Sequence, residues 1–478
     1  MFFNSLAFAV FLPIVFFLYW FVFNKTKSSQ NALLIIASYY FYSCWDWRFL
    51  FLLVFSTFLD YYTGIRIEKS SDEKGRKFWF WLSVGINLGF LGVFKYYNFF
   101  ASSFAELVTG VGFKASPFLL DVVLPVGISF YTFHGLSYVI DIYYKRIKAE
   151  YNFVDYSLFV SYFPLLVAGP IERATHLLPQ IKIKRDFDYN KMIDGLRQIL
   201  WGLFKKMVIA DNCARYVNIM FADTEQQSGS SLALGAVLFA FQIYGDFSGY
   251  SDIALGVSRL LGIELLKNFN FPYFSRDIAE FWRRWHISLT SWFRDYLYIP
   301  LGGSKGGTWM KIRNTCIIFV VSGFWHGANW TFVIWGLLNA FYFLPLLIIK
   351  KNRKNIEIVA KGKILPTFRD LISIILTFSL TTFAWIFFRA DRVEHAIGYI
   401  KRIFTKSLFT IPQQIPTFEI VFLLIFLVLE WLGRESNYGL EKIGLKQPVV
   451  FRWMLYYSLI FMILYMGGSE QKFIYFQF

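Results

Sequence analysis

The chain has 478 residues, of which 56% are hydrophobic, 22% aromatic and 17% charged, and Phe alone occurs 58 times. A soluble domain is typically about one-quarter charged, so this composition excludes a single water-soluble core and indicates that lipid surrounds much of the chain. The net charge of +16 is carried by short basic loops, which is typical of loops retained on the cytoplasmic side of a membrane. Because no soluble basic face is visible, the charge does not predict nucleic-acid binding.

Apolar segments recur along the whole chain. The first, residues 6–23, has about the ~20 residues that cross the hydrocarbon core. It lacks a basic start and a small-residue cleavage site, so we expect a retained span and not a signal peptide. The further candidate spans are residues 33–43, 49–61, 78–93, 122–140, 156–168, 232–244, 316–324, 331–349, 371–388, 420–431 and 451–466.

Several of these segments are shorter than a full crossing, which predicts tilted or re-entrant helices buried by their neighbours. The polar stretches between them are loop-sized, and no internal repeat is visible. We therefore predict an all-α polytopic membrane protein with roughly eleven transmembrane helices, folded as one domain over residues 1–478.

Three cysteines, Cys44, Cys213 and Cys316, lie far apart in apolar or amphipathic stretches. Their spacing predicts neither a disulfide framework nor a metal site. We interpret them as small buried thiols.

Two polar clusters stand in apolar surroundings. The first, FPLLVAGPIER at residues 163–173, ends in Glu172 and Arg173, which could form an interfacial ion pair. The second, QIYGDFSGYSD at residues 242–252, contains Asp246 and Asp252. These carboxylates could cap a helix that begins near Ser251, and a functional role stays open for both clusters.

Residues 274–307 break the apolar pattern, because aromatic and ionisable side chains alternate there and the stretch is too polar to cross lipid. On one helix, a stripe of aromatic and aliphatic residues would line one side at a spacing of three to four. Such a stripe predicts an interfacial helix with aromatic anchors, but it leaves His286 unexplained. The stripe consists of Phe281, Trp285, Leu289, Trp292 and Tyr296.

His326 lies in VVSGFWHGANWTFVIWG between two strongly apolar runs, with Gly323 and Gly327 close by. Ionisable groups at membrane depth are costly and usually face a cavity or the bundle interior. A neutral imidazole there could take the proton from a hydroxyl that attacks an acyl carbon. The alternative is a buried histidine that only bonds a neighbouring helix. No GxSxG, HExxH or Walker-type motif suggests another chemistry.

Two segments together resemble the membrane-bound O-acyltransferase family. They are FWRRWHISLTSWFRDYLYIPLGG at residues 281–303 and SGFWHGANWTFVIWG at residues 322–336. PLLVAGPIER, WGLFKKMVIADN, DFSGYSDIALG and the terminal FIYFQF strengthen the resemblance, which covers most of the chain. Within the family, LYIPLGG after Asp295 is most similar to the bacterial alginate O-acetyltransferase branch. Peptidoglycan and other exopolysaccharide O-acetyltransferases, and the D-alanyl transferases of teichoic acid, are the neighbouring alternatives.

The resemblance implies a ring of membrane helices around a central funnel, with His326 as catalytic base and His286 as the second family histidine. It implies that an acetyl group from a cytoplasmic thioester, acetyl-CoA, crosses the bacterial inner membrane to an exported polysaccharide such as alginate. A partner acetyltransferase of the SGNH-hydrolase type would complete the transfer, with no metal and no further cofactor. Our further candidates for donor or substrate binding are Arg283, Arg284, Arg294, Asn329, Trp325, Asp246 and Glu172.

Coenzyme A carries phosphates, which arginine and lysine bind. The three arginines are therefore candidates for the donor mouth, with Lys205 and Lys206 as an alternative. All of them could instead only hold anionic lipid head groups.

Two other classes compete with an enzyme. A transporter would also place His, Arg and Asp in the membrane, but normally has paired broken helices in two halves. A non-catalytic assembly subunit would explain the aromatic segment but not His326.

Overall fold

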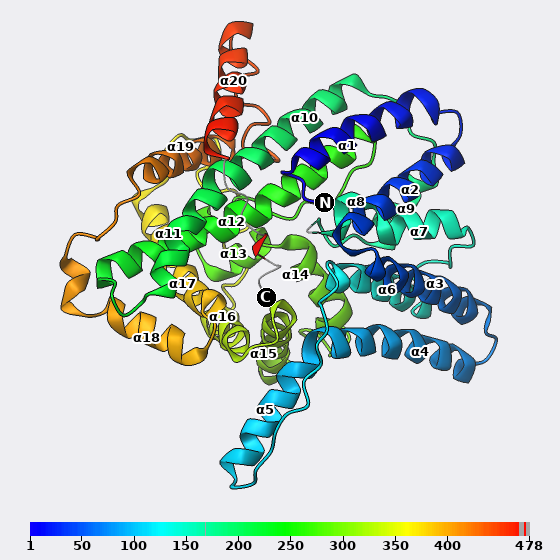
Figure 1. Ribbon diagram of the computed structural model, residues 1–478, viewed down its shortest axis with the longest axis horizontal. Coiled ribbons are helices and arrows are strands. Elements are labelled where there is room, and N and C mark those ends of the chain that lie inside the picture. The colour runs from blue at the N-terminus through cyan, green and yellow to red at the C-terminus, as the bar shows by residue number, and fades with distance from the viewer. Residues whose placement is uncertain (168, 468–472, 475–478) are drawn as a thin grey trace. The chain divides into compact units, whose positions relative to one another are not determined.

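The computed structural model describes residues 1–167, 169–467 and 473–474, which form helices, turns and loops without any β-strand (Figure 1). This confirms the all-α prediction. Contacts divide the chain into unit 1, Met1–Met192 with Val257–Leu266, and unit 2, Ile193–Gly256 with Lys267–Phe478. A single domain over residues 1–478 stays a prediction, as does the central funnel. Ala168 of the PLLVAGPIER motif and residues 475–478 of the FIYFQF ending lie outside the described residues.

Polar side chains cap the starts of several unit 1 helices. The Thr26 side chain accepts from the Ser29 N–H and so caps α2 in a reciprocal capping box, and Asn152 caps α7. Each such cap satisfies N–H groups that a helix leaves unbonded in its first turn. The helices are α1 (Leu6–Phe17), α2 (Lys27–Asp46), α3 (Arg48–Lys69), α4 (Glu73–Leu91), α5 (Tyr97–Gly110), α6 (Ile128–Tyr143), α7 (Phe153–Ser161), α8 (Phe163–Leu166) and α9 (Ala174–Ile181).

Unit 2 holds the C-terminal helices, and two long helices cross the boundary between the units. The crossing helices are α10 (Tyr189–Leu203) and α12 (Gly229–Leu260). Those within unit 2 are α11 (Asp211–Ala222), α13 (Ile278–Arg284), α14 (Ile287–Phe293), α15 (Gly307–His326), α16 (Trp330–Ile348), α17 (Phe368–Arg389), α18 (Val393–Ile403), α19 (Thr417–Gly433) and α20 (Val449–Met466).

Six described helices are long and apolar enough to cross a membrane. This supports an integral membrane protein, while the number of eleven spans stays a prediction. The six are Arg48–Lys69, Glu73–Gly110, Gly229–Leu260, Trp330–Ile348, Phe368–Arg389 and Val449–Met466. The second of them takes α4 and α5 together as one helical segment.

Two predicted boundaries are wrong. The segment predicted at residues 122–140 becomes helical only at Ile128. Pro125 precedes it, which has no N–H to donate, and Gly127 has a left-handed φ of 73°. The predicted helix start near Ser251 does not exist either, because α12 runs unbroken through that residue. Asp246 and Asp252 therefore cap nothing and serve other contacts.

The pair α15 and α16 carries His326 at the turn between its two helices, and glycines let the helices approach closely. A Cβ at Gly323 would lie 2.2 Å from the Phe332 carbonyl oxygen, and one at Gly336 would lie 2.3 Å from that of Phe319. Real Cβ atoms do not come that close, so larger side chains would force the helices apart. Asn329 then starts α16, since its side chain accepts from the Thr331 N–H at 3.0 Å.

Candidate active site

His286 lies at a sharp break between α13 and α14. Its φ of 43° is left-handed, a conformation that costs a residue with a side chain about 1–3 kcal/mol and persists only where its surroundings impose it. A strap of residues 268–270 imposes it here: Ile287 donates its N–H to the Asn268 carbonyl at 2.8 Å, and Asn270 donates to the Arg284 carbonyl at 2.9 Å. The prediction of one continuous helix through this stretch is therefore wrong.

The aromatic stripe predicted for that helix is also buried and does not anchor an interface. The five side chains are between 1% and 9% exposed. They pack inside unit 2, so the stretch forms part of its core. The residues are Phe281, Trp285, Leu289, Trp292 and Tyr296.

Asn268 fixes the protonation pattern of the His286 ring. The Asn268 amide nitrogen lies 3.1 Å from the Ser251 hydroxyl, and its oxygen accepts from the Ser288 hydroxyl at 2.9 Å. That oxygen lies 3.0 Å from His286 Nδ1, so Nδ1 carries the hydrogen and donates it. Nε2 then presents its lone pair, and it is buried with no hydrogen-bond partner among the described residues.

Burial lowers the pKa of His286 to about 3, because the charged imidazolium is poorly solvated away from water. His286 belongs to neither of its flanking helices and to none of the candidate spans. The ring is therefore neutral at ordinary pH. It can accept a hydrogen bond through Nε2, but it is a weak base.

His326 ends α15, and its ring meets that of His286. The two ring centroids lie 6.4 Å apart although 40 residues separate the histidines in the chain. Both side chains are buried, at 4% exposure for His326 and 1% for His286. The fold thus brings the two histidines together, with His286 outside the candidate spans.

Aromatic rings enclose both histidines. The His326 centroid is 4.9 Å from that of Trp325 and 5.2 Å from that of Trp335, and the Phe388 ring lies at 5.3 Å. Phe247 packs edge-on against His286 at 4.6 Å. Such walls keep water from the pair and strengthen any electrostatic interaction inside. Trp325 is the one predicted binding residue whose ring contacts both histidines, at 6.1 Å from His286.

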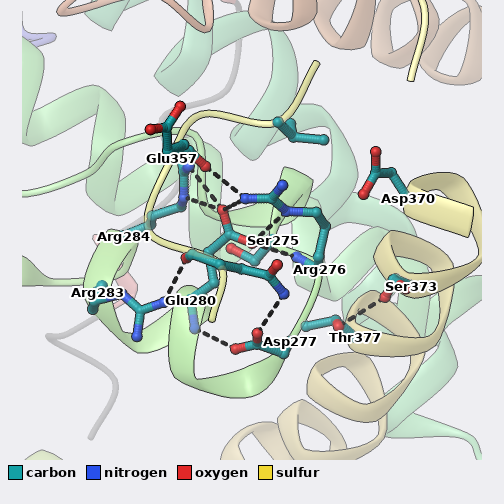
Figure 2. Close-up of polar contacts among 12 residues, drawn as sticks. Ser275, Arg276, Asp277, Glu280, Arg283, Arg284, Glu357, Asp370, Ser373 and Thr377 are labelled. Carbon is teal, nitrogen blue, oxygen red and sulfur yellow. Dashed lines mark hydrogen bonds and ion pairs between the residues drawn. The ribbon is translucent and has the colours of Figure 1, made fainter. Parts of the chain in front are cut away.

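The predicted donor arginines are engaged in protein contacts. Figure 2 shows Arg284 and Arg276 converging on the buried Glu280 carboxylate, at 2.8 and 3.0 Å. Arg283 donates to the backbone carbonyls of Asn352 and Asn355, at 2.7 Å each. All four of these interactions hold α13 in place or hold the basic loop at residues 349–367 against it.

Three further predicted residues also have structural contacts. Arg294 pairs with Asp295 at 2.7 Å, and its side chain is 63% exposed. Asn329 caps α16 and donates its amide to the Asp391 carbonyl at 2.7 Å. Asp246 lies 2.7 Å from the Lys206 ammonium and accepts from the Ile474 N–H at 2.7 Å. A donor-binding role for them stays a prediction.

Glu172 belongs to unit 1, whereas both histidines belong to unit 2. Its carboxylate is fully buried, accepts from the Leu266 N–H at 2.5 Å and lies 2.8 Å from His176 Nδ1. Its own N–H donates to His134 Nε2 at 3.1 Å. The alternative of an ion pair with Arg173 stays a prediction.

Sequence reasoning missed Asn268, which holds His286. It stands in KNFNFPYF, where nothing in the pattern distinguishes it from its neighbour Asn270. It also missed Glu280, although its spacing of four from Arg284 is the spacing of a helical ion pair.

Residues 142–388 match the model of the membrane-bound O-acyltransferase family, and this segment contains both histidines. The chain belongs to this family. It is 36% identical to a probable alginate O-acetylase AlgI of Pseudomonas aeruginosa, over 92% of this chain and 82% of that protein. It is 35% identical to the peptidoglycan O-acetyltransferase of Helicobacter pylori, over 82% and 77%.

A teichoic acid D-alanyltransferase of Bacillus subtilis is 28% identical over 56% of this chain and 70% of that protein. All three relatives are named as enzymes that transfer acyl groups. Family membership and these relatives make the chain a membrane acyltransferase and exclude the transporter and assembly-subunit alternatives as its class. They do not assign roles to individual residues.

Proposed function

We propose that the protein transfers an acetyl group from a cytoplasmic thioester, acetyl-CoA, across the bacterial inner membrane for the O-acetylation of an exported polysaccharide such as alginate. The observation that carries the proposal is the pair of buried histidine rings, 6.4 Å apart, inside an aromatic enclosure. The relatives with 35–36% identity are named for O-acetyl transfer. The lower identity to the D-alanyl transferase favours acetyl over D-alanyl as the transferred group.

His326 is the base in this proposal. One of its ring nitrogens takes the proton of the attacking hydroxyl, the hydroxyl oxygen bonds to the acyl carbon, and the thiolate leaves as the carbon–sulfur bond breaks. His286 is a poor candidate for that step because burial lowers its pKa to about 3. Its Nε2 lone pair can instead accept a hydrogen bond and so orient the hydroxyl or the neighbouring imidazole.

The remaining parts of the proposal concern partners. A polysaccharide is not soluble in the membrane, so the acetyl group must be handed over at the outer face. The resemblance to the alginate branch favours a partner acetyltransferase of the SGNH-hydrolase type as the receiving protein. The Helicobacter relative supports peptidoglycan as a second acceptor of the same class.

The test is transfer of a radiolabelled acetyl group by the purified protein in proteoliposomes. We expect His326→Ala to lose about 10² to 10⁴ in rate, the usual cost of a lost general base, while the protein still elutes as a folded species. His395→Ala is the matched control, because that histidine contacts the Thr224 hydroxyl at 3.1 Å and has no place in the pair. Transfer by His326→Ala at the wild-type rate would contradict the proposal.

A further inference from the structure

Lys267 is a cation inside unit 2 that lacks a carboxylate partner. Its ammonium donates to the Asn270 side-chain oxygen at 2.9 Å, approaches the Ser436 carbonyl at 3.4 Å and lies 5.5 Å from the centre of the Phe271 ring. All of these acceptors are neutral. No carboxylate among the described residues lies within 4.0 Å of it, and its side chain keeps partial access to solvent.

The two fully buried lysines among the described residues of unit 2 are both paired with carboxylates. Lys205 lies 2.5 Å from Asp252, and Lys206 lies within 2.8 Å of both Asp211 and Asp246. A buried charge normally needs such a partner, because burying it alone costs several kcal/mol. Lys267 departs from that pattern, which indicates that its counter-charge comes from a ligand.

Carboxylates near Lys267 are already committed to other groups. Asp252 also accepts from Gln198 at 2.9 Å, and Glu430 accepts from the Tyr244 hydroxyl at 2.6 Å. Glu441 accepts from the Asn437 amide at 2.8 Å. They attract Lys267 only from a distance, and burial still lowers the pKa of Lys267 to about 8.

The position of Lys267 connects the basic loop to the histidine pair. Its neighbour Asn268 holds His286, and the Asn270 backbone carbonyl accepts from Arg284 at 3.1 Å. Arg284 follows Arg283, which holds the loop at residues 349–367 by its carbonyls. Through these contacts Lys267 lies between the strap that holds His286 and the helix that holds the loop.

The contact between Lys267 and the Ser436 carbonyl also leads to this loop. Ser436 follows Arg434 by two residues, and Arg434 donates to the carbonyls of Val359 and Ala360, at 3.0 and 2.7 Å. The loop carries exposed basic side chains, which would draw an anion toward this face. They are Lys350, Lys351, Arg353, Lys354, Lys361 and Lys363.

We infer that Lys267, with Asn270, binds a phosphate group of the acyl-thioester donor and so fixes the donor with its thioester toward the histidine pair. This inference rests on the proposed function. A phosphate could also come from a phospholipid head group, and the experiment below separates the two sources.

The experiment measures the affinity of coenzyme A for the purified full-length protein in neutral, phospholipid-free detergent, by calorimetry and by the rise in Tm. We expect Lys267→Met to weaken binding about tenfold to a hundredfold, the loss of one hydrogen bond made by a charged group, without lowering the Tm of the unliganded protein. Lys267→Arg keeps the charge and should recover part of the affinity. Lys442→Met, at an exposed lysine of the same unit, is the matched control.

A wild-type measurement covers the case in which Lys267→Met does not fold. Coenzyme A should then protect Lys267 from an amine-reactive succinimidyl ester, as followed by mass spectrometry, and undiminished labelling would overturn the inference. An unchanged affinity of Lys267→Met overturns it as well. So does stabilisation by phosphatidylglycerol, in place of coenzyme A, that depends on Lys267.

The proposed function fails separately. If wild-type protein neither binds coenzyme A nor transfers acetyl groups, both proposals are wrong. If wild-type protein transfers acetyl groups and Lys267→Met binds the donor normally, only the role of Lys267 is wrong.

Discussion

Asn268 fixes the orientation of the His286 ring, and Asn268→Leu tests whether that orientation matters for the proposed transfer. The substitution keeps a side chain of similar size but removes the oxygen that accepts from His286 Nδ1 and from the Ser288 hydroxyl, at 3.0 and 2.9 Å. Each buried donor left without its acceptor costs about 1–3 kcal/mol. The His286 ring would turn to find a new acceptor, and its Nε2 lone pair would then point in another direction.

We expect the kcat for acetyl transfer to fall by about tenfold to a hundredfold, if about 1.4–2.8 kcal/mol of that cost appears in the transition state. The KM for the acyl donor should change little, because Asn268 bonds to His286 and the serines and not to the donor. Asn352→Leu is the matched control, since only its backbone carbonyl is used by Arg283. A kcat for Asn268→Leu equal to that of wild type would refute the positioning role.

Two further predictions concern stability. Gly336→Ala should lower the free energy of unfolding by about 1–3 kcal/mol, because its Cβ would lie 2.3 Å from the Phe319 carbonyl oxygen. Gly85→Ala is the control: its Cβ would meet open space, so the Tm should stay equal or rise. Equal Tm losses in the two variants would contradict the close approach of α15 and α16. His286 has a pKa of about 3 in the folded protein and about 6.5 when unfolded, so acid protonates the unfolded chain first and stability falls as pH drops below about 6.5. Between pH 7 and 5 this lowers the free energy of unfolding by about 2 kcal/mol. In His286→Gln this contribution is absent, so the Tm should fall less between pH 7 and 5 than it does in wild type. An equal fall of the Tm in both proteins would show that His286 is not neutral in the folded protein.

The sequence draws attention to the two histidines because the chain has only five and because each stands in an unusual stretch. His326 stands between two apolar runs, and His286 lies in a stretch too polar for lipid. Burial of His326 follows from its apolar flanks, whereas the polar stretch around His286 does not predict burial. The meeting of the two histidines does not follow from the sequence either, since 40 residues separate them and only the packing of α13 to α16 brings the rings together.

The local geometry of the site could not be predicted, because it depends on bonds between distant segments. Helical spacing predicts a continuous stripe through Trp285, but two backbone hydrogen bonds from the strap force His286 into a left-handed conformation. Charge alone predicts the arginines at the donor mouth. Charge does not reveal that Arg283 donates to backbone carbonyls about 70 residues away. Every residue has a backbone carbonyl, so the sequence does not show which of them accepts a hydrogen bond.

The course of the chain through α16 and α17 shows at which end of these helices His326 lies and at which end the basic loop lies. Both helices are candidate membrane spans that follow one another in the chain, so residues 349–367 lie at one end of the pair. The opposite ends meet where Asn329 donates to the Asp391 carbonyl at 2.7 Å. His326 lies three residues before Asn329 and packs on Trp335 and Phe388, so it belongs to the end remote from the basic loop. Under the proposed function the loop faces the cytoplasm, and the base then lies toward the side on which the acetyl group leaves.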